Sequence, residues 1–142
     1  MEDRPIKIPK NLEECFTELE DMLDPKDVFA IKNGKWEDGD EKDEHGYYNN
    51  MFFGHWLHMQ LGMWLRNNWG LWTGGQLRDW FNEKGIWHAD DMSGIILESF
   101  RRRLNLQPIL LESQIEHYQK FWDDRGVDVK AEALKAREAS GS

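Results

Sequence analysis

The feature that most constrains the fold is a dense aromatic block at residues 55–106. It contains six of the chain's eight tryptophans: Trp56, Trp64, Trp69, Trp72, Trp80 and Trp87. Tryptophan buries a large surface and needs a partner for its indole N–H, so this density indicates either a highly specified core or a binding surface. With 142 residues, the chain suits one domain around a single core.

Apolar residues recur at helical spacing almost throughout the chain, and neither strand alternation nor an internal repeat is present. We therefore expect an all-α fold, a compact non-repeating bundle of about five to six helices. The expected helices span 11–23, 25–33, 50–68, 74–84, 91–105 and 112–125. The helix over 50–68 is apolar on most of its circumference, which is typical of a buried helix, so we expect it to be the central element.

Local signals at the helix starts support these boundaries. Asn11 and Thr73 each precede a helical run and have Glu or Gln three residues later, which is the capping-box pattern. For the fifth helix, either Asp90 or Asp91 is placed to cap the first turn. Trp36 and Trp87 fall in expected loops, so they should be the tryptophans nearest the surface.

The chain is predicted to form a single helical domain over residues 1–126. Residues 33–47 are polar, charged and glycine-containing, and we expect an exposed acidic loop there. Residues 127–142 have few apolar side chains, so this tail either extends as a helix, frays, or is partly left over from cloning.

The net charge of −9 is unevenly distributed. Residues 1–44 contain 15 acidic and 7 basic residues, and the densest acidic run is 37–44. This argues against direct nucleic-acid binding, which needs a basic face for the phosphates. It fits docking on a protein partner with a basic surface, and equally a solvated loop that aids solubility.

The single cysteine and the distribution of apolar residues predict where in the cell the protein is located. Cys15 has no second cysteine to pair with, which fits a reducing environment, and its amphipathic context favours a core position. No run of 18 apolar residues is present, so we expect no membrane span. The first residues lack an apolar signal stretch, and the expected location is the cytoplasm.

A polar stripe is the main candidate for a ligand pocket. His55, His58, Gly62 and Arg66 are spaced by 3, 4 and 4 residues, which places them on one face of a regular helix. The stripe is either the wet face of that helix or one wall of a polar pocket. In the pocket interpretation, His55 or His58 is the acid/base and Arg66 the anion anchor. The positioning group is then Asn67 or Asp91.

The sequence contains no complete catalytic or metal-binding constellation. His55 and His58 lack the neighbouring acid of a zinc-protease helix, so we assign no metal site. Asp90 and Asp91 point about 100° apart on a helix and would not share a proton. One of them is instead placed to pair with Arg66. We expect no catalytic residue and no cofactor.

Two segments carry a family resemblance: LGMWLRNNWGLW at 61–72 and FNEKGIWHADDMSGIIL at 81–97. Together they resemble a domain of unknown function found in small α-helical proteins of bacteria and their phages. The similarity covers roughly residues 55–122, and the start at 8–15 also fits it. The resemblance implies a bacterial or phage origin and supplies no activity; residues 33–54 look like an enlarged acidic insertion.

The leading functional hypothesis is a small acidic domain that binds another protein, as immunity proteins and phage-encoded inhibitors do. The acidic run would steer it toward a basic surface, and nearby aromatic residues would anchor it. The expected partner-binding residues are Trp36, Glu37, Asp38, Asp40, Glu41, Asp43, Glu44, Tyr47 and Tyr48. Alternatives are a small-molecule binder or enzyme that uses the polar stripe, and a homo-oligomeric module.

Overall fold

The computed structural model describes residues 6–37, 41–42, 44–46 and 53–140, and within them every regular element is a helix. The elements are α1 (Leu12–Met22), α2 (Pro25–Asn33), α3 (Phe53–His55), η2 (Trp56–Gly62), α4 (Met63–Asn68), α5 (Gln76–Glu83), α6 (Ala89–Leu104), α7 (Leu111–Asp124) and α8 (Val129–Ser140). If the continuous segment Phe53–Asn68 is counted once, the described chain has seven helices, slightly more than predicted. The predicted all-α class is confirmed.

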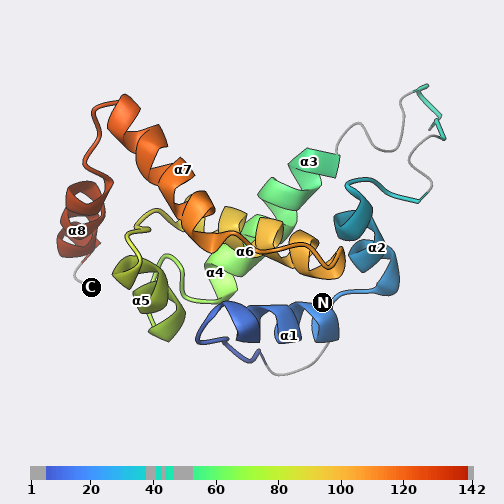
Figure 1. Ribbon diagram of the computed structural model, residues 1–142, viewed down its shortest axis with the longest axis horizontal. Helices are drawn as coiled ribbons and strands as arrows, with labels where there is room; N and C mark the ends of the chain where they lie inside the picture. The colour runs from blue at the N-terminus through green and yellow to red at the C-terminus, as the bar shows by residue number, and fades with distance from the viewer. Residues whose placement is uncertain (1–5, 38–40, 43, 47–52, 141–142) are drawn as a thin grey trace.

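The most buried helix is α6. It passes through the middle of the molecule, with α1 below it and α2 at its right end in Figure 1. Met92, Ile95, Ile96 and Phe100 are completely or almost completely enclosed. Helices α1, α2, η2, α4 and α7 all contact α6, so α6 organises the core.

The continuous segment Phe53–Asn68 was expected to be buried on most sides, and this expectation is wrong. Leu61 and Leu65 face the core, but Met59 and Met63 are each about 40% exposed on the other side. Its middle, η2, is a π-helix rather than an α-helix. A π segment has i→i+5 hydrogen bonds and a wider turn, so it breaks the 3.6-residue periodicity on which the expectation rested.

The helix caps agree with the sequence in part. Asn11 caps α1 by accepting a hydrogen bond from the Glu14 backbone N–H at 3.0 Å, as predicted. The Thr73 capping box is wrong, because α5 begins after Gly75 without a side-chain cap. The predicted aspartate cap of α6 is also wrong, since His88 supplies it: Nδ1 accepts from the Asp90 N–H at 3.0 Å.

The tryptophans divide between the core and the surface in a way the sequence did not predict. Trp69 is 1% exposed, whereas Trp72, only three residues later, is 50% exposed. Trp36 and Trp87 are half-buried, so the expectation that they are the outermost is wrong. Trp36 packs against Phe53 and Trp56, with ring centroids 5.5 and 4.7 Å apart.

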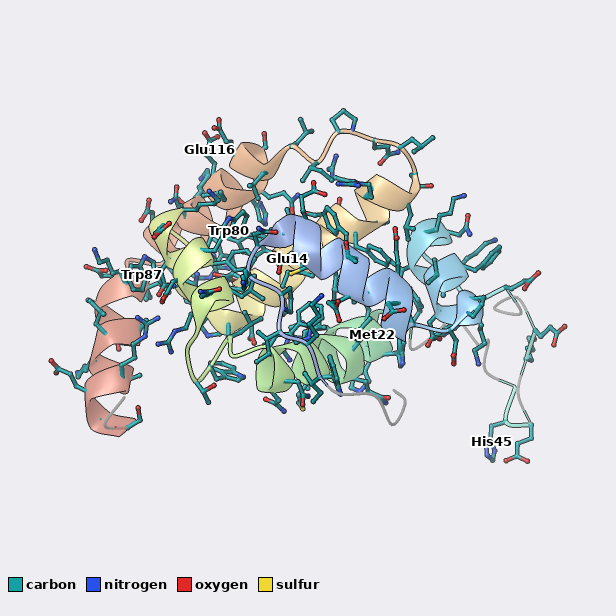
Figure 2. The ribbon with its side chains drawn as sticks, turned by 90° about the horizontal axis from the view of Figure 1, so that it is seen from below. Glu14, Met22, His45, Trp80, Trp87 and Glu116 are labelled. Atoms are coloured by element: carbon teal, nitrogen blue, oxygen red, sulfur yellow. The ribbon has the colours of Figure 1, made fainter. Side chains whose placement is uncertain are left out.

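The last two helices cover one side of the molecule. Helix α7 packs on α6 where Gly94 leaves room, because a Cβ there would clash with the Tyr118 hydroxyl. In the described part of the tail, residues 129–140 form α8. Figure 2 shows Trp87 beside α8, and Lys130 and Arg137 of α8 each place a cation about 5.2 Å from its ring centre. None of the described helices is both long and apolar enough to cross a membrane.

Candidate functional site

The N-terminal end of α6 gathers several of the predicted site residues. Arg66 of α4 is 4% exposed and uses its whole guanidinium group there. Nη1 donates to Ser93 Oγ at 2.8 Å, Nη2 donates to the His58 carbonyl at 3.2 Å, and Nε lies 3.3 Å from Asp90 Oδ1. The predicted pairing of Arg66 with one of the two aspartates is therefore present, and the partner is Asp90.

Gly62 explains why Arg66 fits into this position. A Cβ at Gly62 would lie 2.9 Å from Arg66 Nη1, so the glycine leaves the space that the guanidinium occupies. The π segment brings the His58 carbonyl to Arg66, while the His58 side chain is exposed. Arg66 is therefore a structural link between α4 and α6, and its donors are engaged within the protein.

Asp91 belongs to a second cluster, on the α7 side of α6. Its Oδ2 accepts a hydrogen bond from Trp122 Nε1 at 2.8 Å, and the residue is 7% exposed. Burial raises the pKa of the Asp91 carboxyl, and the indole hydrogen bond lowers it in part. The Trp122 ring also stacks on His88, with centroids 5.6 Å apart. Asp91 therefore attaches α7 to the start of α6.

The remaining predicted pocket residues do not join these clusters. His55 and Asn67 are exposed. His58 lines a cavity of about 200 Å³ with Ser93, Glu98 and Arg101, and none of the other four predicted pocket residues lines that cavity. Among the described residues, no three His, Cys, Asp or Glu side chains are grouped to hold a metal ion. Burial raises the pKa of Cys15, which keeps it a thiol in the core.

The predicted partner-binding segment is described only in part. Glu37, Glu41 and Glu44 are exposed, and Trp36 is half-buried against the aromatic side chains of the Phe53 helix. Outside the described residues lie Asp38, Asp40, Asp43, Tyr47 and Tyr48.

The C-terminal end of α6 presents a site that the sequence analysis missed. Leu106 is 93% exposed and Leu110 is 53% exposed, although both are large apolar side chains. Both also have left-handed backbone, with φ of 57° and 53°. The left-handed conformation is energetically unfavourable for leucine. Single strained residues of this kind concentrate at functional sites. We name residues 105–110 the leucine loop.

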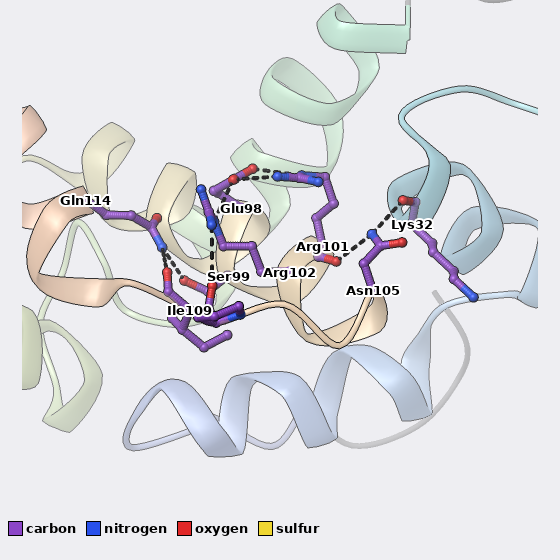
Figure 3. A network of polar contacts seen from close by, with 9 residues as sticks. Lys32, Glu98, Ser99, Arg101, Arg102, Asn105, Ile109 and Gln114 are labelled. Atoms are coloured by element: carbon purple, nitrogen blue, oxygen red, sulfur yellow. Dashed lines mark hydrogen bonds and ion pairs between the residues drawn. The ribbon is translucent and has the colours of Figure 1, made fainter.

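Polar contacts hold the leucine loop from several sides (Figure 3). Asn105 Nδ2 donates to the Lys32 carbonyl at 2.8 Å and to the Arg101 carbonyl at 2.9 Å. On the other side, Gln114 Nε2 donates to the Ile109 carbonyl at 2.9 Å and to Ser99 Oγ at 3.0 Å. The leucines are therefore displayed on a braced loop.

Charged groups surround the base of this loop. Glu98 bonds Arg101 and Arg102 at 2.7–2.9 Å, and these hydrogen bonds lower the pKa of its carboxyl. Arg102 Nη1 also reaches the Pro108 carbonyl at 3.3 Å. Of the basic run 101–103, Arg102 therefore holds the loop backbone, whereas Arg103 pairs with Glu13 of α1. In the sequence, the signal for this site is a leucine-rich segment around Pro108, between the two predicted helices 91–105 and 112–125.

A family model described as a domain of unknown function (DUF6794) matches residues 8–104. The match begins at the predicted start and ends at residue 104 rather than 122, so the leucine loop, α7 and α8 lie beyond it. No curated protein and no solved structure matches the chain.

Proposed function

Because the chain belongs to the DUF6794 family, whose description assigns no activity, we propose from the geometry alone that it is a protein-binding domain anchored by the leucine loop. The observation that carries the proposal is Leu106: a large apolar side chain, 93% exposed, in a left-handed conformation. A fold that needed only to connect α6 to α7 would gain stability from glycine or asparagine at this position. An exposed apolar anchor on a rigid loop is what a protein interface uses.

Glu37, the first acidic residue of the run 37–44, follows an element that contacts the leucine loop. Asn105 bonds the carbonyl of Lys32, near the end of α2, and the exposed Glu37 follows only five residues later. In Figure 1, α2 and the end of α6 lie together at the right. The partner we propose therefore combines an apolar cleft for the leucines with a basic rim for the acidic segment.

In this role the domain acts by occupying a partner's surface, as immunity proteins and phage-encoded inhibitors do. The leucines determine how long the complex lasts, because buried apolar anchors control dissociation. The acidic residues raise the association rate at low salt, because attraction between opposite charges acts before contact. A small-molecule activity at the polar stripe gains no support, because the Arg66 donors are engaged internally.

The test is affinity capture from a lysate of the source organism with the intact chain and two matched variants. Leu106→Ser removes the proposed anchor, and Leu134→Ser removes a leucine of α8 that is 42% exposed and lies outside the loop. We expect a stoichiometric protein to be captured by the intact chain and by Leu134→Ser, and to be lost with Leu106→Ser.

A third variant tests whether the acidic residues attract the partner before contact. Neutralising the acids of 37–44 with Ser or Asn should slow association at low salt and leave dissociation unchanged. Equal capture by Leu106→Ser and the intact chain would reject the leucine loop as the anchor. If the intact chain self-associates in sedimentation and Leu106→Ser does not, the loop is a homo-oligomer contact and the proposed partner is wrong.

A further inference from the structure

A separate cavity lies at the opposite end of α6 from the leucine loop. It has a volume of about 250 Å³ and lies between α5, the segment before α6, and α8. One wall comes from the matched part of the chain and includes Trp72, Arg78 and His88. The other wall comes from α8, beyond the match, and includes Glu132 and Arg137. We name this cavity the α8 pocket.

Aromatic rings supply much of the pocket's apolar surface. Trp72 is half exposed and meets the His88 ring edge-on, with centroids 5.7 Å apart. Trp87 lines the same cavity and holds α8 through Lys130 and Arg137. A tryptophan side chain exposed at a cavity is typical of a binding surface. The flat rings at the cavity wall suit a planar ligand.

Two guanidinium groups line the same cavity. Arg78 Nη1 donates to the Trp72 carbonyl at 2.9 Å, but its Nε, although buried, has no hydrogen-bond acceptor among the described residues. Arg137 Nη2 donates to Asn82 Oδ1 at 2.8 Å. Burial first, and then the charge of Arg78, lower the pKa of Arg137. Placing two like charges close together costs energy, and an anion between them would offset that cost.

The hydrogen bonding of His88 adds a donor. Its Nδ1 accepts from the Asp90 N–H, so in the neutral ring the proton resides on Nε2. The acid on the cavity wall, Glu132, opposes an anion. The pocket lining therefore includes two arginines, one histidine and one carboxylate.

We propose that the α8 pocket binds a small anion with a planar apolar body, such as an aromatic carboxylate or an aryl phosphate. Arg78 and Arg137 meet the anionic group, and Trp72 and His88 pack against the ring. The cavity is smaller than the roughly 300–1,000 Å³ typical of drug-sized ligand sites, which restricts the ligand to one or two rings. This site is independent of the leucine loop.

The test uses fluorine NMR titrations of the full chain with three probes. These are para-fluorobenzoate, para-fluorophenyl phosphate and the neutral para-fluorobenzamide. We expect saturable binding of at least one anion, about tenfold tighter than the amide, because a charge-assisted hydrogen bond contributes that much. The better of the two anions identifies carboxylate or phosphate as the ligand class. Equal affinity for all three probes would overturn the proposal.

Four variants locate the site. Arg78→Gln should weaken anion binding about tenfold, and Glu132→Gln should strengthen it, because it removes an opposing charge. Ala133→Leu should block binding by filling the cavity while leaving every charge in place. Lys120→Gln removes an exposed cation of α7 and is the matched control, with no change expected. If Arg78→Gln fails to fold, Glu132→Gln and Ala133→Leu decide; unchanged anion binding in both would overturn the proposal.

Discussion

The two ends of α6 are built in opposite ways. At the N-terminal end, Arg66, Ser93 and Asp91 are buried, and each has a hydrogen-bond partner at 2.8 Å. At the C-terminal end, the backbone is also held by hydrogen bonds, but the side chains it carries are apolar and exposed. The first end fulfils the usual requirement that buried polar groups be paired, whereas the second departs from the usual burial of leucine.

This difference separates residues that maintain the fold from residues available for a partner. Changes at the N-terminal end should destabilise the protein, because they leave buried groups without partners. Changes at the leucine loop should leave the stability of the fold unchanged or raise it. The two leucines are exposed to solvent, and their left-handed backbone is strained. Stability measurements at three sites test this division, in order of decreasing effect.

The largest expected effect is at Arg66. Arg66→Ala leaves the buried Ser93 hydroxyl, the His58 carbonyl and the partly exposed Asp90 carboxylate without their shared donor. We expect a loss of about 3 kcal/mol in the free energy of unfolding, because buried acceptors lose their donor and a large buried side chain is removed, measured by urea denaturation. The control is Arg103→Ala at the other end, which breaks a largely exposed ion pair with Glu13 and should cost about 1 kcal/mol or less. Similar losses of stability in the two variants would contradict the proposed difference between the two ends of α6.

The next effect is at Asp91. Asp91→Leu leaves the Trp122 indole N–H without its acceptor, whereas Asp91→Asn keeps an acceptor oxygen and removes the charge. We expect Asp91→Asn to be more stable than Asp91→Leu by about 1–3 kcal/mol, measured in urea at pH 7.

The pH dependence of Asp91 has a definite sign. Because burial raises the folded-state pKa of Asp91 above its ordinary value of 3.8, the folded state holds the proton more tightly than the unfolded state. The contribution of Asp91 to stability therefore falls as pH rises from 3.8 through the folded pKa. Relative to the native chain, Asp91→Asn should gain stability over that window, and a relative loss would contradict the sign.

The smallest effect is at Leu106. Leu106→Gly relieves the left-handed strain and removes only an exposed side chain. We expect a gain of about 0.5–1 kcal/mol, measured by the shift of the urea midpoint. Leu134→Gly is the matched control, and it should lose about 1 kcal/mol, because glycine weakens a regular helix. A clear loss of stability in Leu106→Gly would show that the leucine has a structural role and would remove the contrast between the two ends.

The candidate sites were only partly predictable. The sequence predicted that Arg66 pairs with an aspartate. Arg66 belongs to the polar stripe of one predicted helix, and the two aspartates lie at the start of another. The sequence did not identify Arg78 and Arg137, since they are 59 positions apart and only the docking of α8 brings them to one cavity. It also placed the two histidines and Arg66 on one face, which holds for an α-helix and fails across the π segment η2.

The all-α class, the family and most helix boundaries could be predicted from the amino-acid sequence. Asn11 begins α1, Pro25 begins α2 and Gly34 ends it, because each acts through backbone geometry within a few residues. The packing of the helices, in contrast, makes α6 the centre, buries Trp69 while Trp72 is exposed, and leaves Leu106 in solvent. Burial depends on which distant helices meet, and hydrophobic attraction has no direction that a local pattern could encode.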